Sequence, residues 1–514
     1  MTHYETIIGL EVHAQLLTAS KMFCGCNAAY AAAPPNTHVC PVCMALPGVL
    51  PVINRAAVEQ TILAGLALNC AIGPEAVFAR KNYHYADLPK GYQISQYELP
   101  LCREGWIEVE DEVEGKVKRI GITRAHLEED TGKLIHTTGA SLVDLNRAGV
   151  PLLEIVTEPD MRSPDEAYAY LTRLQRILRY LQVSTADMEK GAMRCEANVS
   201  VRPAGQAAFG VKVEVKNLNS FRAVKLALEY EVSRQIAALE RGERVVQVTM
   251  GWDEERGRTV IQRVKESAND YRYFPEPDLP PLVIAPEWVA AIRSRLPELP
   301  DARMARFVNE LGLDPQDARV LAEDRAVAEY YESVLRQASA IRPAGPPGQQ
   351  REIPSAVTPK TVANWVTGEL FRLMNAAGAE IAAVRITPEA FAELLELAAA
   401  GQINLNSAKR VFGVMFETGR PARAIVQELG LTQVSDVDAL AAAVAGIIGQ
   451  YPDEVARYRG GKESLFNWFL GQVMRETRGK GNPAVVKDLL REALTANADL
   501  KSSTGGCHVL RRTR

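Results

Sequence analysis

The chain has 514 residues, 47% of them hydrophobic and 24% charged, and a formal net charge of -4. This composition is typical of a soluble globular protein with about three domains, and it argues against a generic nucleic-acid-binding protein. Apolar runs such as 439–448 are shorter than the roughly 20 residues that a membrane span needs. The N-terminal MTHYETIIGLEVH lacks the basic and apolar blocks of an export signal, so we expect a cytoplasmic protein with reduced thiols and no membrane partner.

Four segments in the first 290 residues alternate apolar and polar side chains with the period of two that is typical of a half-buried strand. They are TIIGLEVHAQL, RIGITRAHLEED, CEANVSVR and GVKVEVKN. We expect these segments to join one large antiparallel sheet with a dry face and a wet face. The wet face is rich in acids, amides and imidazole, which favours a concave working surface over a face that only meets solvent.

Four of the eight cysteines crowd into one loop as two close pairs. Cys24 and Cys26 form the first pair, and Cys40 and Cys43 form the second. Two such pairs can supply the four thiolates that Zn²⁺ accepts in a tetrahedral site. Because four thiolates leave no open coordination position, we predict a structural zinc site that orders the loop. Four unrelated reduced cysteines are the alternative.

A polar run with little aliphatic content follows as KNYHYADLPKGYQ. It is too polar for a core, so it is either a hydrogen-bonded surface loop or the wall of a pocket. Its candidate ATP or substrate ligands are Lys81, Tyr83, Tyr85, Lys90 and Gln93.

Acidic residues gather on the polar faces of the predicted strands. The candidate Mg²⁺ ligands, which are also the candidate catalytic residues, are Glu11, His13, Glu128, Glu129 and Glu154. Carboxylates so grouped repel one another unless a cation lies among them, and Mg²⁺ bearing nucleotide phosphate is the expected counterion. Such a site predicts phosphoryl transfer, in which Lys or Arg clamps the phosphates. No glycine-rich phosphate loop occurs, so from these residues alone ATP stays one interpretation.

A helix is clearly signalled after the acidic segments. Ser163 is the expected N-cap, Pro164 the first helical residue and Glu166 the partner in a capping box. The apolar stripe that follows should pack on the dry face of the sheet.

Further candidate ligands for ATP or substrate lie on either side of this helix. Arg147 and Lys216 are candidate phosphate clamps, and VKNLNSF places amides and a hydroxyl before a helix, whose N-terminus attracts phosphate or carboxylate. The whole set is Arg147, Glu214, Lys216, Asn217, Asn219 and Ser220.

The chain becomes helical after a proline-dense stretch that ends near Pro297. The predicted class is therefore α+β. We expect a sheet domain at 1–297, an all-α domain at 298–400, a helical tail domain at 401–497 and a disordered tail at 498–514. The Pro/Gly-rich segment near 343–350 should be an exposed loop.

The C-terminal part is basic, because residues 401–514 hold 16 Lys and Arg against 11 Asp and Glu. This surface can meet RNA phosphates, and the alternative is a solvated helical surface. The candidate ligands for RNA phosphates are Lys409, Arg410, Arg420, Arg423, Arg475, Arg478 and Lys480.

Several long motifs resemble the GatB family, which forms the B subunit of the aspartyl/glutamyl-tRNA(Asn/Gln) amidotransferase. They include IGLEVHAQL, CPVC, RKNYHYADLPKGYQISQY, GITRAHLEEDTGK, DLNRAGVPLLEIV and DYRYFPEPDLPP. The resemblance runs from about Tyr4 to Leu494. It implies a cradle-shaped N-terminal domain that binds ATP and Mg²⁺, with the five candidate ligands around the metal, and a YqeY-like tail domain that binds tRNA.

The resemblance also implies a reaction and its partners. A Glu-tRNA(Gln) or Asp-tRNA(Asn) would be phosphorylated on its side-chain carboxylate and then amidated by ammonia, so the enzyme is a ligase of protein biosynthesis that forms a carbon–nitrogen bond. An amidase (glutaminase) partner, the A subunit, would release the ammonia from glutamine, and a small C subunit would complete a heterotrimer. A non-discriminating aminoacyl-tRNA synthetase is a further candidate partner. The polar run at 81–93 would belong to the substrate pocket and the ammonia route.

Three interpretations of the function stay open at this point: an amide-forming enzyme, a non-catalytic scaffold that delivers tRNA, and a stand-alone metallohydrolase. A closed four-thiolate site disfavours the last. No Gly/Ser-rich amidase pattern occurs, so this chain should not hydrolyse glutamine itself. Either of the two misacylated tRNAs, or both, is the expected substrate.

Overall fold

The computed structural model describes residues 3–110, 115–264, 271–340, 357–431, 437–477 and 481–495. The chain divides into two compact units, Met1–Ala302 and Arg303–Arg514, close to the predicted boundary at 297. The predicted exposed loop at 343–350 and the predicted disordered tail at 498–514 lie outside the described residues. Among the described residues, no helix has the length and apolarity to cross a membrane.

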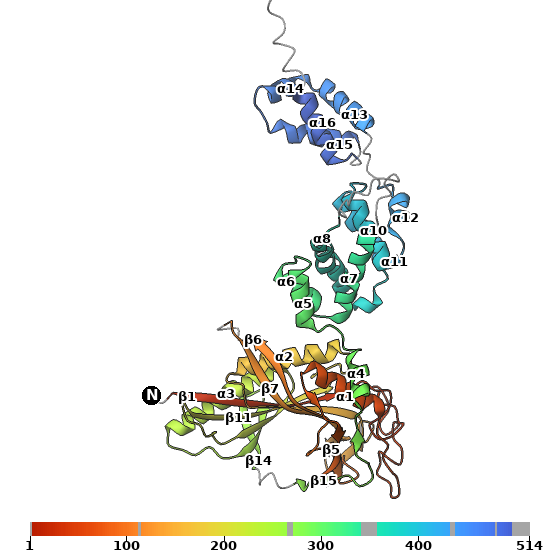
Figure 1. The fold of residues 1–514 in the computed structure, drawn as a ribbon. Coiled ribbons are helices and arrows are strands. Elements are labelled where there is room, and N and C mark those ends of the chain that lie inside the picture. Colours follow the sequence, from red (N-terminus) through yellow and green to blue (C-terminus); the bar gives the residue numbers. More distant parts are fainter. Residues whose placement is uncertain are drawn as a thin grey trace, which may run out of the picture. The chain divides into compact units, whose positions relative to one another are not determined.

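A nine-stranded sheet forms the centre of the first unit (Figure 1). Its order is β14 (Arg258–Val264), β13 (Val248–Asp253), β12 (Val213–Leu218), β11 (Met193–Pro203), β1 (Tyr4–Gln15), β10 (Pro151–Thr157), β7 (Val117–Glu129), β6 (Cys102–Glu110) and β2 (Ala71–Ile72). The four predicted strands correspond to β1, β7, β11 and β12, and the α+β class is confirmed. The pairing is antiparallel except between β12 and β13, which are parallel because helix α3 (Phe221–Glu240) connects them as a crossover.

Three smaller sheets contain the remaining strands of the described residues. The first contains β15 (Phe274–Pro275), β4 (Phe78–Asn82) and β5 (Tyr92–Gln96), the second β16 (Leu282–Val283) and β3 (Glu75–Ala76), and the third the hairpin of β8 (Lys133–Thr137) and β9 (Ala140–Asp144).

Helices cover one face of the large sheet, and Figure 1 shows α2 (Pro164–Tyr180) and α3 lying along it. The predicted N-cap of α2 is confirmed, because Ser163 accepts a hydrogen bond from the backbone N–H of Glu166 at 3.1 Å. The predicted capping box differs in its second bond, since the carboxylate of Glu166 accepts from the backbone N–H of Arg162 at 2.7 Å. The apolar stripe of α2 is buried against the sheet, with Leu171 and Leu174 fully covered. Helices α1 (Arg55–Ala67) and α4 (Pro286–Arg293) also contribute to this core. The polar side chains of the sheet point to the other face, which these helices do not cover.

The second unit is helical. Its elements are α5 (Pro300–Asn309), α6 (Pro315–Ala322), α7 (Arg325–Ala340), α8 (Pro359–Asn364), η2 (Trp365–Leu370), α9 (Phe371–Ala377), η3 (Ile381–Ala383), α10 (Pro388–Ala399), α11 (Leu405–Thr418), α12 (Ala422–Glu428), α13 (Val437–Gln450), α14 (Pro452–Arg459), α15 (Leu465–Glu476) and α16 (Pro483–Thr495).

The helices of this unit form two separate cores, and their division differs from the predicted boundary at 400/401. Phe412 and Met415 of α11, beyond that boundary, pack with Trp365 and Phe391, which precede it. The second core begins at Leu440 and contains α13 to α16. Because apolar contacts continue across residue 400, α11 and α12 belong with the preceding helices.

Candidate functional site: an acidic cavity and a cysteine cluster

Strand register brings distant acids and imidazoles together on the uncovered face of the large sheet. His13 of β1 lies opposite Glu154 of β10, and Glu154 lies opposite His126 of β7. Residues directly opposite in antiparallel strands point to the same face, so these three side chains form a row across the sheet. Glu11 and Glu128 lie two residues along from His13 and His126 and share that face, because side chains alternate along a strand.

The members of this row are within reach of one another. Nε2 of His13 lies 3.3 Å from Oε2 of Glu154, 3.8 Å from Oε1 of Glu11 and 3.9 Å from Oε2 of Glu128. Nε2 of His126 lies 3.6 Å from both Glu128 and Glu154. Two overlapping sets of potential metal ligands result, each with its ligand atoms within 4.8 Å: Glu11, His13 and Glu154, and His126, Glu128 and Glu154.

These groups change one another's pKa. Burial alone would lower the pKa of His13, but Glu154 and Glu11 raise it to about 9. Burial also opposes ionisation of Glu154, yet the nearby imidazoles hold its pKa well below the usual range. The pKa of Glu11 is raised, first by burial and then by the charge of Glu154. Glu11 is therefore the acid of this group whose ionised form burial opposes most effectively, and a cation bound beside it would favour that form.

A chain of hydrogen bonds fixes the buried Glu128. Ser95 donates to its Oε1 at 2.5 Å, and Gln93 donates through Nε2 to its Oε2 at 3.0 Å. Tyr83 in turn donates to Oε1 of Gln93 at 3.0 Å. Two of the predicted pocket residues, Tyr83 and Gln93, therefore orient a candidate metal ligand.

The cluster lies in a cavity of about 710 Å³. Cations line it beside the acids: Nζ of Lys81 is 3.9 Å from Oε1 of Glu128, and Nζ of Lys216 is 2.7 Å from Oε2 of Glu196. The sequence-predicted residues that the structure brings to this cavity are Glu11, His13, Lys81, Tyr83, Tyr85, Gln93, Glu128, Glu154, Glu214 and Lys216. A cavity with both hard acids and cations suits a metal-bound polyanionic ligand.

Several lining residues were not predicted. Arg124 lies 3.6 Å from Oε1 of Glu154, and Arg194 forms a 2.7 Å ion pair with Asp130. Strand alternation could have found both, because Arg124 is two residues from His126 and Arg194 is two residues from Glu196. Other unpredicted lining residues include Tyr97, Thr131, Thr249, Gln262, Tyr271 and Tyr273.

Glu129 and Lys90 do not line this cavity, which differs from the expectation that Glu129 joins the other four candidate Mg²⁺ ligands. Glu129 points to the opposite face of β7 from Glu128, because neighbouring side chains of a strand point to opposite sides. Its Oε1 lies 2.6 Å from Nζ of Lys90 and accepts from the backbone N–H of Ile94 at 2.9 Å. Glu129 and Lys90 line a second cavity of about 230 Å³, together with Cys24 and other residues of the cysteine loop.

Four further candidate ligands do not line the large cavity. Arg147 donates to the backbone carbonyls of Thr131 and Gly132 and so supports the segment after β7. Asn219 donates to Glu254, and Ser220 caps α3.

Asn217, the fourth of these residues, has a φ of 59° at a register shift between β11 and β12, a conformation that Asn tolerates better than most residues. Together the four residues serve local geometry in this structure.

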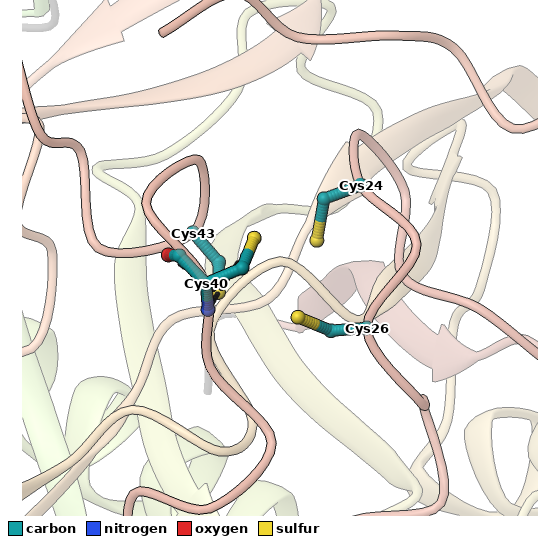
Figure 2. Close-up of side chains that lie close together, drawn as sticks. All are labelled: Cys24, Cys26, Cys40 and Cys43. Atoms are coloured by element: carbon teal, nitrogen blue, oxygen red, sulfur yellow. Dashed lines mark hydrogen bonds between the residues drawn. The ribbon is translucent and has the colours of Figure 1, made fainter.

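The predicted cysteine cluster is assembled, and Figure 2 shows side chains from two loop segments facing one another. The four Sγ atoms of Cys24, Cys26, Cys40 and Cys43 lie within 4.8 Å of one another. A hydrogen bond with Cys24 lowers the pKa of the Cys43 thiol to about 4 and raises that of Cys24, so one thiolate is shared within this pair. The backbone N–H of Cys40 also donates to the sulfur of Cys43 at 3.1 Å. Four convergent sulfurs with a stabilised thiolate fit a tetrahedral zinc ion.

The predicted tRNA ligands differ in their surroundings. Lys409 is paired with Glu369, Arg420 with Glu428, and Arg423 with Glu393. Arg410 and Arg475 are exposed, whereas Arg478 and Lys480 lie outside the described residues.

Comparison with known proteins gives a consistent result over almost the whole chain. A family model described as the GatB/GatE catalytic domain matches residues 6–290, and one described as the GatB domain matches residues 352–494. The chain is 54% identical over 494 residues to the B subunit of the aspartyl/glutamyl-tRNA(Asn/Gln) amidotransferase of Roseiflexus castenholzii, covering 96% of this chain and 99% of that protein. It is 51% identical over 492 residues to the protein of the same name from Thermodesulfovibrio yellowstonii, with 96% and 99% covered.

Proposed function

Because the chain belongs to the GatB family, the B subunits of the aspartyl/glutamyl-tRNA(Asn/Gln) amidotransferase, we propose that its acidic cavity is where a misacylated tRNA becomes amidated. The observation that carries this proposal is the convergence of Glu11, His13, Glu128 and Glu154 beside Lys81 in one large cavity. A carboxylate must gain a good leaving group before ammonia can displace its oxygen at neutral pH. In the proposed reaction its oxygen takes the γ-phosphoryl group of ATP as ADP leaves. Ammonia then displaces phosphate and loses a proton to give the amide.

The donor set fits a magnesium ion. Mg²⁺ is commonly held by one or two protein carboxylates, water and substrate phosphates, and each of the two overlapping ligand sets offers two carboxylates within the required space. Nδ1 of the buried His126 has no hydrogen-bond partner among the described residues, so no neighbouring group fixes which ring nitrogen carries the proton. When bound, the ion would neutralise charge on the nucleotide phosphates.

The cations of the cavity have separate roles in this proposal. Lys81 lies at 18% exposure against Glu128, where it can meet phosphate oxygens without leaving the acid unpaired. Arg124 of β7 lies beside Glu154, and Lys216 of β12 lies on the same face beside Glu196. Fixed positive groups around a site of charge transfer stabilise the transition state more than mobile solvent does.

We propose a structural zinc ion for the cysteine cluster. The four sulfurs come from a loop that contains no helix or long strand. Regular secondary structure therefore does not hold this loop in place. A closed set of four thiolates stabilises such a loop and leaves no position for a reacting water.

The remaining parts of the proposal concern partners. The relatives are named as B subunits, which implies further subunits, and we propose an amidase A subunit that supplies ammonia and a small C subunit, in a cytoplasmic heterotrimer. We further propose that the helical second unit contacts tRNA through exposed cations, such as Arg410 of α11 and Arg475 of α15.

The decisive experiment is an amidation assay of the complete complex on Glu-tRNA(Gln) and on Asp-tRNA(Asn). We expect amide formation that needs ATP, Mg²⁺ and either glutamine or free ammonia. Turnover that proceeds without ATP would contradict the proposal.

Binding of tRNA should weaken steeply with salt, and Arg410→Ala should reduce the slope of log K against log salt by about 1. The paired Arg423 provides the matched control, since Arg423→Ala removes a cation already bound to Glu393.

A further inference from the structure

A row of tyrosines forms one wall of the acidic cavity. Tyr97, Tyr273, Tyr271, Tyr83 and Tyr85 all line it, and each touches the next through its ring. Two of them come from the motif DYRYFPEPDLPP, which the proposed chemistry does not otherwise use. The contacts between Tyr271, Tyr83 and Tyr85 are edge-to-face at centroid distances of 5.9 Å. Such contacts fix the rings against one another and make the wall rigid.

The pair at one end of the row is different. Tyr97 and Tyr273 stack in parallel, with ring centroids 4.3 Å apart and planes only 7° apart. Tyr97 is nevertheless 47% exposed, so about half of its surface stays open beside the guanidinium of Arg124, which lies over its ring. A parallel stack continues naturally when a third flat ring is added to its outer face.

Charged groups connect this pair with the centre of the cavity. The guanidinium of Arg124 lies 5.8 Å from the centroid of the Tyr97 ring and 3.6 Å from Oε1 of Glu154. In the middle of the row, Nζ of Lys81 lies 5.3 Å from the centroid of Tyr271 and 3.9 Å from Oε1 of Glu128. Aromatic surface interleaved with cations is the combination that binds a nucleotide, because the base stacks while the cations meet phosphate.

We propose that Tyr97 and Tyr273 form a stacking platform for an adenine ring and so hold an adenine nucleotide with its charged end toward Glu154. This inference rests on the proposed function, which brings two adenines to the cavity: that of ATP and that of the terminal adenosine of the tRNA. The shared chemistry is a flat purine that carries a reactive or anionic group on its ribose. The platform makes Tyr97 a positioning residue for that group.

Kinetics of the assembled complex test the platform. Tyr97→Ala should raise the KM of either ATP or misacylated tRNA by roughly 5- to 100-fold, with kcat at saturation within about twofold of wild type. Tyr97→Phe keeps the ring and should restore the KM, whereas Tyr97→Leu keeps apolar bulk without a flat face and should not. Tyr168→Ala is the matched control, because Tyr168 is 44% exposed but packs on Phe221, away from the cavity.

A binding measurement separates the two sources of adenine and the two proposals. The probes are an ATP analogue with 2-aminopurine as its base and a short RNA hairpin whose unpaired 3′ end finishes in 2-aminopurine. Stacking should quench the fluorescence of one probe in wild type and in Glu154→Gln, and Tyr97→Ala should abolish that quenching. If neither probe responds to Tyr97→Ala, or Tyr97→Leu behaves like Tyr97→Phe, the platform is refuted. If quenching depends on Tyr97 but wild type forms no amide, the proposed function fails and the platform stands.

Discussion

The cysteine cluster and the acidic cavity are two ways of gathering metal-binding side chains in one folded unit. The four cysteine sulfurs lie within 4.8 Å of one another, and so do the ligand atoms within each of the two overlapping acidic sets. The cysteines come from a single loop, between Cys24 and Cys43. The acids and imidazoles come from three strands, β1, β7 and β10, and meet only because those strands are neighbours in the sheet. A local site can therefore be inferred from spacing, whereas a site spread over a sheet depends on strand order and register.

The two regions also differ in chemistry. The cysteine set contains four soft sulfur ligands and is complete in itself, which is typical of a structural site. The acidic set combines oxygen and nitrogen ligands with neighbouring cations and a cavity of about 710 Å³. Charge that the protein leaves partly unpaired, next to open space, is typical of a site that binds and transforms a ligand.

The largest effect should come from the centre of the cavity. Glu154→Gln removes a charge shared by His13, His126 and Arg124, so we expect amidation by the complex to fall about 100- to 1000-fold. The assay is turnover of misacylated tRNA at saturating ATP. Glu189→Gln, an exposed acid on the same unit, should leave the rate unchanged. Full activity of Glu154→Gln would favour the scaffold interpretation instead.

Removing the zinc ligands should lower the free energy of unfolding more than it lowers the rate of amide formation. A ligand present at 100 to 1000 times its Kd stabilises the folded state by about 2.7–4.1 kcal/mol, so Cys40→Ser with Cys43→Ser should lose about that much. Metal analysis should find one zinc ion per wild-type chain and none in the double variant. Cys70→Ser serves as a control for replacing a buried thiol outside the cluster. Unchanged zinc content in the double variant would contradict a site at these four cysteines.

Adjacent residues of β7 offer a sharper comparison of the two regions. Glu128 faces the acidic cavity and Glu129 faces the side of the cysteine loop. Glu128→Gln should raise the Mg²⁺ concentration for half-maximal activity by about tenfold or more, because a candidate ligand loses its charge. Glu129→Gln should leave that concentration unchanged, whatever it does to the rate. Equal shifts in the two Mg²⁺ titrations would mean that both acids act on the same ion.

A smaller effect is expected at the edge of the cavity. Burial raises the pKa of Asp130, but Arg194 and Arg147 overcome this and lower it below its usual value. A lowered pKa contributes stability above about pH 4, and that contribution is lost as the pH falls through the folded-state pKa. Asp130→Asn should therefore destabilise the protein at pH 7 by about 1–2 kcal/mol, since Arg194 is partly exposed and screened.

The measurement for Asp130 is thermal unfolding of wild type and Asp130→Asn from pH 7 downward. The difference between them should shrink as the pH drops below about 4. A difference that grows toward acid pH would mean that the carboxyl is protonated, not ionised, in the folded protein.

Sequence patterns predicted much of the site, and their failures have physical causes. Alternation along β1 correctly joined Glu11 and His13, which the structure places on one face. The same alternation separates Glu128 from Glu129, so grouping them by proximity in sequence was misleading. Arg147 has the right charge for a phosphate clamp, but its guanidinium is occupied by two backbone carbonyls. Its charge alone did not indicate that its hydrogen bonds go to the backbone.

The sequence by itself determined the local features: the capped helix α2, the four alternating strands, the paired cysteines and, through its motifs, the family. These depend on neighbours a few residues apart, where spacing fixes geometry. Only the tertiary structure decided that β10 lies between β1 and β7, and hence that Glu154 meets both His13 and His126. Strand order is set by burial of the whole apolar face, a long-range property that no short segment carries.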